Sequence, residues 1–137
     1  MDYAVKLGDP IAMHDLAYLL IQYRRDGLEK DDVYPLLLES AELGYSAAYT
    51  AIGRLHLKGK FGFRASDAAR WFRSGVDAGH PGAMAELATL YVEGKLVSRD
   101  INIARDLALQ GARLNHVGSK RILSKILEQE NADSGRG

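Results

Sequence analysis

The 137-residue chain lacks cysteine altogether, has only three prolines and contains no long hydrophobic run. The absence of cysteine excludes disulfide frameworks, thiol nucleophiles and zinc sites with cysteine ligands. The apolar stretches fall short of the roughly 20 residues that span a bilayer, and residues 1–10 lack the pattern of a secretion signal. The 18 Lys and Arg residues are balanced by 18 Asp and Glu residues, so there is no basic excess of the kind that drives nonspecific binding to nucleic acid or anionic membranes. We therefore expect a soluble protein that binds neither, cytoplasmic by default, or periplasmic or secreted if a signal segment was removed.

A repeat runs through the chain. Helix-stop residues recur at Gly8, Gly44, Gly79 and Asn115, with spacings of 36, 35 and 36 residues. Apolar and small residues recur in the same register, as in the sets Ala12, Ala48, Ala83 and Ser119; Leu16, Ile52, Leu87 and Leu123; and Leu19, Leu55, Leu90 and Ile126. The repeat predicts a single domain over 1–127, with a partial unit at 1–8, full units at about 9–44, 45–79 and 80–115, and a partial unit at 116–127. The polar segment 128–137 is expected to be a flexible tail.

Each full unit has the apolar spacing of two helices. The first helix is expected to begin at Asp9-Pro10 or His80-Pro81, because proline is tolerated at the first helical position. The second is expected to begin near Asp32, Ser66 or Asp100, whose side chains can accept hydrogen bonds from free backbone N–H groups. Pro35 then has to lie in the first turn of a helix that begins near Asp32. Glycines at 27, 59, 62 and 94 indicate the connectors between paired helices.

One helix hairpin cannot bury its own apolar face, whereas a stack of three or more can. The sequence therefore predicts an all-α protein, a right-handed superhelical α-solenoid of antiparallel helix hairpins with a concave and a convex surface. Small residues such as Gly53 and Gly75 are expected where helices approach closely, and Trp71 and Tyr91 are expected to pack between neighbouring hairpins.

The segment 78–94, AGHPGAMAELATLYVEG, resembles the opening of a Sel-one-like repeat, a relative of the tetratricopeptide repeat. The closing half of that repeat is matched at Val97, Asp100, Ala104, Leu107, Gly111-Ala112 and Asn115, and in the second unit at Ala68, Trp71, Gly75-Val76 and Gly79. The resemblance covers about 3–127. It implies a tetratricopeptide-like solenoid that serves as an adaptor or scaffold in protein assembly, often in bacteria, and it implies no chemistry.

Repeat proteins of this kind commonly bind partners along the concave face, which is formed by the first helix of each unit. By register with the tetratricopeptide repeat, the expected partner-binding row is His14, Tyr18, Gln22, Thr50, Arg54, Lys58, Glu86, Thr89, Glu93, Arg121 and Lys125. The row is basic in the middle and at the end and acidic in the third unit, which suits a peptide carrying both signs of charge. The alternative is that these are ordinary solvated helix faces.

The histidines are better explained by structural roles than by a metal site. His80 and His116 occupy the same repeat position a full unit apart, so turn-forming residues explain them without a metal. His14 falls on the predicted groove. His56 occupies the repeat position that Tyr91 holds in the third unit. Packing or hydrogen bonding is therefore expected for both. The Gly44-Tyr45-Ser46 run follows a helix, whereas a nucleophile elbow follows a strand. We expect no catalytic, metal or cofactor site.

Two connectors carry residues with open roles. Phe61 and Phe63 flank Gly62 and are expected to plug the end of the hairpin, with an exposed docking tip as the alternative. Arg24-Arg25-Asp26 is expected to be a solvated loop, with partner contact as the alternative.

Together these observations predict a non-enzymatic protein–protein interaction module. The alternative is a structural module that forms a homodimer through a solenoid end, where Val5 and Leu7 would lack a covering helix. The identity of the protein or peptide partner does not follow from the sequence.

Overall fold

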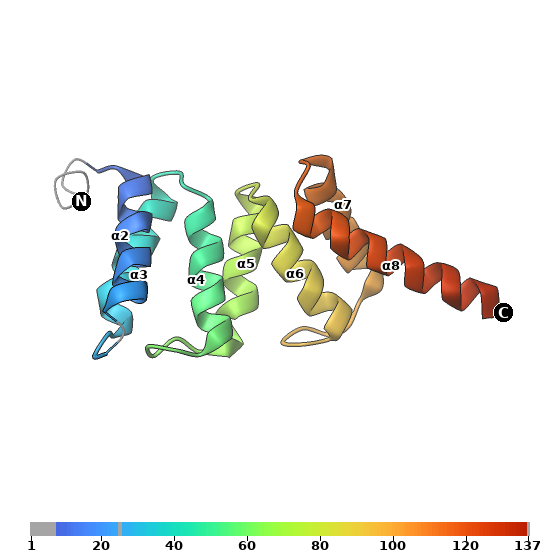
Figure 1. Ribbon diagram of the computed structural model, residues 1–137, viewed down its shortest axis with the longest axis horizontal. Helices are drawn as coiled ribbons and strands as arrows, with labels where there is room; N and C mark the ends of the chain where they lie inside the picture. The colour runs from blue at the N-terminus through green and yellow to red at the C-terminus, as the bar shows by residue number, and fades with distance from the viewer. Residues whose placement is uncertain (1–7, 25, 137) are drawn as a thin grey trace.

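A computed structural model describes residues 8–24 and 26–136, apart from the side chain of Arg136. The helices form an elongated row with the N-terminal helix at one end and the C-terminal helix at the other (Figure 1). In chain order they are α2 (Pro10–Tyr23), α3 (Lys30–Glu42), α4 (Ala47–Lys58), the 3-10 turn η1 (Ala65–Asp67), α5 (Ala68–Asp77), α6 (Pro81–Glu93), α7 (Ile101–Arg113) and α8 (Val117–Arg136). No strand occurs within the described residues, so the all-α prediction is confirmed.

The helices pair as hairpins that stack on one another. Helices α2 and α3, α4 and α5, and α6 and α7 pack within their units, while α3 on α4, α5 on α6 and α7 on α8 join successive units. Helices α4 and α6, and α6 and α8, also pack directly against each other. The chain is therefore an α-solenoid, in which each hairpin buries its apolar face against its neighbours.

The first helices begin where the sequence predicts. The side chain of Asp9 accepts hydrogen bonds from the N–H groups of Ile11 and Ala12, at 2.9 and 3.2 Å, and Pro10 is the first residue of α2. Helix α6 likewise has a proline, Pro81, as its first residue, but the side chain of His80 before it makes no capping hydrogen bond. Of the expected second-helix caps, Asp100 accepts a hydrogen bond from the N–H of Ile103 at 3.1 Å. These contacts satisfy donors that the helix itself leaves unpaired.

The other two second-helix starts differ from the prediction. Helix α3 begins at Lys30, and Asp32 lies inside its first turn, where its carboxylate accepts a hydrogen bond from the N–H of Glu29 at 2.8 Å. Pro35 therefore lies in the helix interior and not in the first turn. Proline there removes a hydrogen bond to the carbonyl four residues earlier. That carbonyl belongs to Asp31, which is exposed to water, as is Pro35 itself. In the second unit the turn η1 occupies the position of Ser66, and α5 begins at Ala68.

The predicted helix stops share one backbone geometry. Gly44, Gly79 and Asn115 have φ angles of 103°, 83° and 61°, the left-handed region expected just after a helix. The next N–H in each unit donates to a carbonyl five residues earlier, as His80 does to Gly75 at 2.9 Å and His116 to Gly111 at 3.0 Å. The repeat in the sequence thus corresponds to a backbone hydrogen bond that recurs at the end of each unit.

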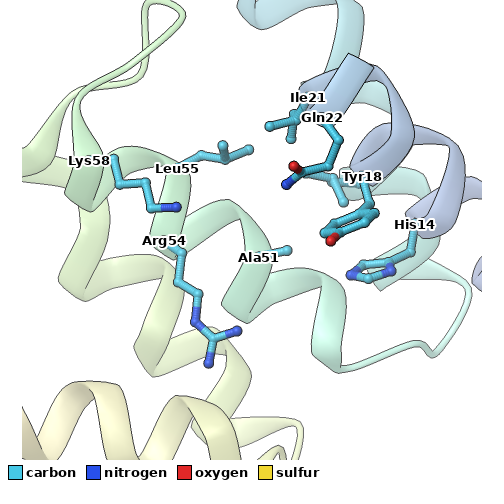
Figure 2. Close-up of a pocket in the computed structure, with 9 residues that line it drawn as sticks. His14, Tyr18, Ile21, Gln22, Ala51, Arg54, Leu55 and Lys58 are labelled. Carbon is cyan, nitrogen blue, oxygen red and sulfur yellow. The ribbon is translucent and has the colours of Figure 1, made fainter. Parts of the chain in front are cut away.

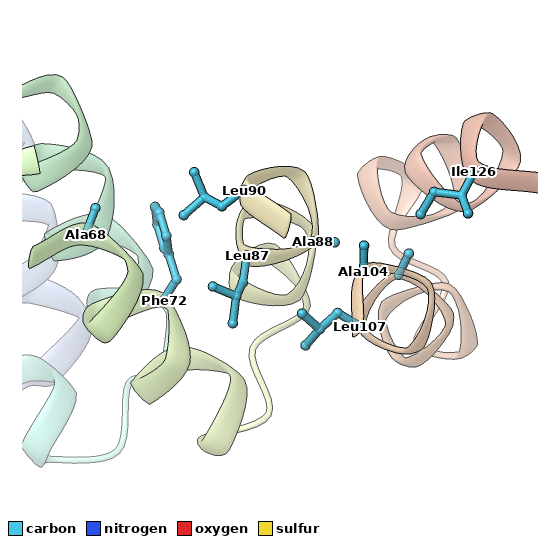
Figure 3. Close-up of a cluster of buried hydrophobic side chains, with 9 residues drawn as sticks. Ala68, Phe72, Leu87, Ala88, Leu90, Ala104, Leu107 and Ile126 are labelled. Atoms are coloured by element: carbon cyan, nitrogen blue, oxygen red, sulfur yellow. The ribbon is translucent and has the colours of Figure 1, made fainter. Parts of the chain in front are cut away.

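The buried core extends across the boundaries between units, in two clusters. One cluster of buried side chains extends from α5 through α6 and α7 to Ile126 of α8 (Figure 3). Phe72 of this cluster is fully buried, and it lies so close to Gly53 that a Cβ atom on Gly53 would be 2.5 Å from Phe72 Cε1. Trp71 is half-buried and packs against the cluster of the first two units, where it stacks on Tyr49 at 6.3 Å between ring centroids. The close contact predicted at Gly53 is confirmed, with Phe72 as the residue that requires it.

The C-terminal segment is helical over the residues described, where a flexible tail was expected. Helix α8 runs without a break to Arg136, past the boundary expected at 127. Its extension is held to the body by an ion pair between Arg105 of α7 and Glu130. Residues 1–7, with Val5 and Leu7 of the expected partial unit, lie outside the described residues.

Candidate partner-binding grooves on the first-helix face

Helices α2, α4, α6 and α8 are the first helices of their units, and the surface they form is called the first-helix face below. Between α2 and α4 this face is hollowed into a groove of about 330 Å³, the N-terminal groove. Its polar rim combines His14, Tyr18 and Gln22 of α2 with Arg54 and Lys58 of α4 (Figure 2). Its apolar lining consists of Ile21, Leu37, Ala51 and Leu55. The groove thus brings together five of the eleven predicted residues.

The α2 side of the groove is set by aromatic packing. The His14 ring meets Tyr45 edge to face, at 5.1 Å between centroids, and its Nδ1 lies 3.4 Å from a carboxylate oxygen of Asp15. Tyr18 is 56% exposed and therefore available to a ligand. Figure 2 shows His14, Tyr18 and Gln22 directed from α2 toward the α4 wall.

The interval between α4 and α6 is bridged by polar side chains. Arg54 Nε donates to Glu86 Oε1 at 3.2 Å, and Thr50 Oγ1 lies 2.6 Å from Nδ1 of His80. Burial lowers the pKa of His80, and the positive charge of Arg54 lowers it further. Thr50 is fully buried, so its assignment to the exposed partner-binding row is wrong. The reason is that His80, at the start of the next first helix, covers it.

A second hollow of about 400 Å³, the C-terminal groove, lies between α6 and α8. The predicted residues Thr89, Glu93 and Lys125 line it, together with apolar side chains that include Ile122 and Ile126. Gln129 and Asp133 also line it, and Gln129 Nε2 donates to Asp133 Oδ1 at 3.1 Å. These two residues were not predicted, because 128–137 was expected to be a tail, although the apolar residues of α8 were already in helical register. Arg121 is exposed on α8 and lines neither groove.

Two repeat positions distinguish the open intervals from the bridged one. Tyr18, Arg54 and Thr89 each lie ten residues after their stop glycine, and each faces the residue seven positions after the next stop, which is Ala51, Glu86 or Ile122. The first and third combinations line grooves, whereas Arg54 and Glu86 form an ion pair. The acidic third unit and the basic middle therefore partly neutralise each other.

The two remaining histidines, His56 and His116, contact neighbouring side chains and backbone, as expected. His56 is buried, its ring meets Phe63 edge to face at 4.9 Å, and Nδ1 lies 3.1 Å from the N–H of Arg64. Burial lowers its pKa. His116 Nδ1 contacts Ser119 Oγ at 3.0 Å, within its own turn. In 8–24 and 26–136 no three His, Cys, Asp or Glu side chains come together as metal ligands would.

The connector aromatics differ in burial. Phe63 is 3% exposed and packs on Tyr34 and His56, so the hairpin plug is confirmed for this residue. Phe61 is half-buried, with a left-handed φ of 56°, and borders a small hollow next to the N-terminal groove. Ser46 lies between two helices and not after a strand, which does not fit a nucleophile elbow. Arg24 and Asp26 are exposed, and Arg25 lies outside the described residues.

Three solved structures of bacterial proteins share this architecture. A Sel1 repeat protein from Oxalobacter formigenes superposes with a TM-score of 0.78 at 26% identity, over 90% of this chain and 51% of that one. A protective antigen of uropathogenic Escherichia coli strains with an SLR fold gives 0.73 at 19% identity, over 93% and 32%. Helicobacter pylori cysteine rich protein B gives 0.68 at 16% identity, over 89% and 93%. This chain thus spans about half of the first protein and a third of the second.

No family model matches the sequence, and no curated protein does. The fold is that of a tetratricopeptide-like α-solenoid. Within that class, its structural neighbours are Sel1 repeat and SLR-fold proteins, so the resemblance of the repeats to the Sel-one-like repeat family is confirmed. Among the residues described, no helix combines the length and hydrophobicity needed to cross a membrane.

Proposed function

We propose that this chain is a non-enzymatic interaction module that binds a protein or peptide segment along its first-helix face, the concave face of the solenoid. The observation that carries the proposal is the N-terminal groove, where five predicted residues form a polar rim over an apolar lining. An extended peptide needs this combination, because apolar contacts supply affinity and a few polar groups fix its register.

The chemistry of the titratable groups favours binding over catalysis. His56 and His80 have lowered pKa values, and both rings face packing partners inside the solenoid. A catalytic base would have to reach a substrate in a groove. The charged residues of the first-helix face are spread over three units, which suits a ligand that runs along it.

Filling the groove tests the proposal. In Ala51→Phe the added ring would occupy the N-terminal groove without changing any charge, since Ala51 lines it. The matched control is Ala78→Phe, at an exposed position at the end of α5. Affinity capture from cell extract, followed by mass spectrometry, is expected to yield partner proteins that native protein and Ala78→Phe retain and Ala51→Phe loses. Equal capture by all three, with circular dichroism showing equal folding, would refute the groove as the binding site.

Self-association through a solenoid end is the second candidate, and it rests on the apolar Val5 and Leu7 of the sequence. Sedimentation equilibrium of native protein and a Val5→Ser, Leu7→Ser variant tests it. A native dimer that the variant does not form supports assembly through that end, and a monomeric native protein excludes it.

A further inference from the structure

We propose, building on the proposed function, that the N-terminal groove selects an acidic segment of a partner protein. In this proposal a ligand carboxylate binds Lys58 and competes with Glu86 for Arg54, while a neighbouring apolar side chain enters the groove. Glu86 is thus an internal competitor that the ligand has to displace.

The charges of the groove are of one sign. Arg54 and Lys58 stand on its α4 rim, and none of the described residues that line it is acidic. Lys60 borders the adjoining small hollow, which shares Lys58 with the groove. On the α2 side, the Asp15 carboxylate lies 3.4 Å from Nδ1 of the rim residue His14. Charge complementarity therefore favours an anionic ligand.

Lys58 is available to such a ligand. Among the residues that the structure describes, its ammonium has no hydrogen-bond or ion-pair partner within the usual distances. Figure 2 shows its side chain extending across the groove toward Gln22 of α2. A carboxylate in the groove would meet this cation directly, through a charge-assisted hydrogen bond.

Arg54 is held at the edge of the groove by an exchangeable contact. Its Nε donates to Glu86 at 3.2 Å, and the two side chains are 52% and 29% exposed. Figure 2 shows the Arg54 guanidinium directed away from Tyr18 and Lys58. Ion pairs as exposed as this contribute little net stability, so a second carboxylate can replace Glu86 at small cost.

The apolar lining of the N-terminal groove indicates which residue should lie next to the acidic residue of the ligand. Ile21, Leu37, Ala51 and Leu55 provide an apolar surface between the two rims. Exposed charges are screened at physiological salt, so charge alone gives weak affinity. An apolar side chain adjacent to the acid would bury this surface and add the larger part of the binding free energy. The ligand class is therefore an acidic segment interrupted by Leu, Ile or Phe.

Selection from a random dodecamer library on phage, with the full chain as bait, tests this class without assuming a sequence. Enrichment of Asp or Glu next to large apolar residues is the expected result. The best selected peptide, labelled with fluorescein, is then titrated by anisotropy against native protein, Lys58→Gln, Glu86→Gln and the control Arg113→Gln, an exposed cation at the end of α7.

The two charge variants, Lys58→Gln and Glu86→Gln, are expected to act in opposite directions. Lys58→Gln should weaken binding about two- to fivefold, and Glu86→Gln should tighten it by a similar factor, because the internal competitor has lost its charge. Arg113→Gln should bind as native protein does. Higher NaCl should reduce the affinity and narrow these differences. If Glu86→Gln binds the peptide no more tightly than native protein does, Glu86 does not compete with the ligand. If the selected peptides are not enriched in Asp or Glu, the ligand is not an acidic segment.

The Ala51→Phe variant separates this inference from the function on which it rests. If Ala51→Phe abolishes binding of the selected peptide while both charge variants bind as native protein does, the groove binds peptides and the acidic specificity is wrong. If Ala51→Phe binds normally, both proposals fail for this groove. Self-association of the native protein that Lys58→Gln abolishes would identify a second copy as the occupant, and would overturn the acidic partner.

Discussion

The N-terminal groove and the neighbouring interval between α4 and α6 use the same repeat positions with different results. In the groove the register places Tyr18 opposite Ala51, and these residues leave a hollow. In the next interval it places Arg54 opposite Glu86, and these residues form an ion pair. A second pair of repeat positions differs as well. In the groove, His14 packs against Tyr45, whereas in the next interval Thr50 is hydrogen-bonded to His80.

This difference shows how a repeat protein varies its surface without changing its scaffold. The helix stops at Gly44 and Gly79 keep the same backbone geometry, so the spacing of the units is set independently of the side chains between first helices. Two positions in each unit are then free to open or bridge an interval. A groove on this face is therefore made by omitting a contact between first helices.

The contact between Gly53 and Phe72, on the bridged side, is expected to give the largest effect. Phe72→Ala should lower the free energy of unfolding by about 3–5 kcal/mol, because Phe72 is fully buried. Gly53→Ala should cost about 1–3 kcal/mol through the clash with the ring. In the Phe72→Ala background the same change should become neutral or stabilising by up to about 1 kcal/mol, since alanine favours the helix. Urea denaturation of native protein, the two single variants and the double variant measures these free energies of unfolding.

Gly135→Ala serves as the control for that series, because a Cβ at this position meets no atom within 4 Å. It should not destabilise the protein. A loss at Gly53 that is the same with and without the Phe72 ring would contradict the packing described here.

The bridge at His80 predicts a pH dependence of intermediate size. Folding lowers the pKa of His80 below its ordinary value of 6.5, so the unfolded chain binds a proton more readily. The contribution of His80 to the free energy of unfolding should therefore be fully present above pH 6.5. It should decrease as the pH falls below 6.5. In His80→Asn, which keeps a residue suited to a helix start, the fall between pH 7 and pH 5 in the urea midpoint should be smaller than in native protein. Equal falls would mean that other groups cause the acid sensitivity.

Copying the bridge into the open interval should have the smallest effect on stability. A Tyr18→Arg, Ala51→Glu variant recreates the charges of Arg54 and Glu86 across the N-terminal groove. Its free energy of unfolding should change by less than about 1 kcal/mol, as for other exposed ion pairs. The selected peptide should no longer bind, whereas Tyr18→Arg alone should retain binding. Binding by the double variant would show that these two positions do not decide access to the groove.

Much of the fold could be predicted because it depends on local signals. The left-handed residues at Gly44, Gly79 and Asn115 and the helix starts at Asp9 and Asp100 are visible in the sequence, and each has a local physical cause. Pro35 was misplaced because the general rule against proline in a helix interior is weaker on an exposed helix face, where water can bond the carbonyl left unpaired; Asp31 and Pro35 are both exposed.

The site could be predicted only in part, because register gives a residue's position on its own helix but not what lies across from it. Thr50 has the register of an exposed groove residue, yet His80 of the next unit covers it. Gln129 and Asp133 line a groove because α8 continues, and the composition of 128–137 gave no sign of this. Whether the eleven residues bind a partner stays a prediction.

The ion pair between Arg105 and Glu130 has a practical consequence for anyone who shortens or fuses this protein. The last repeat-like residue is 127, and a cut placed there would look harmless in an alignment of the units. It would remove Glu130 and leave Arg105 without its partner, and it would take Gln129 and Asp133 from the wall of the C-terminal groove. A tag or fluorescent protein joined beyond residue 136 would keep both, so the better place to divide the chain lies outside the repeat.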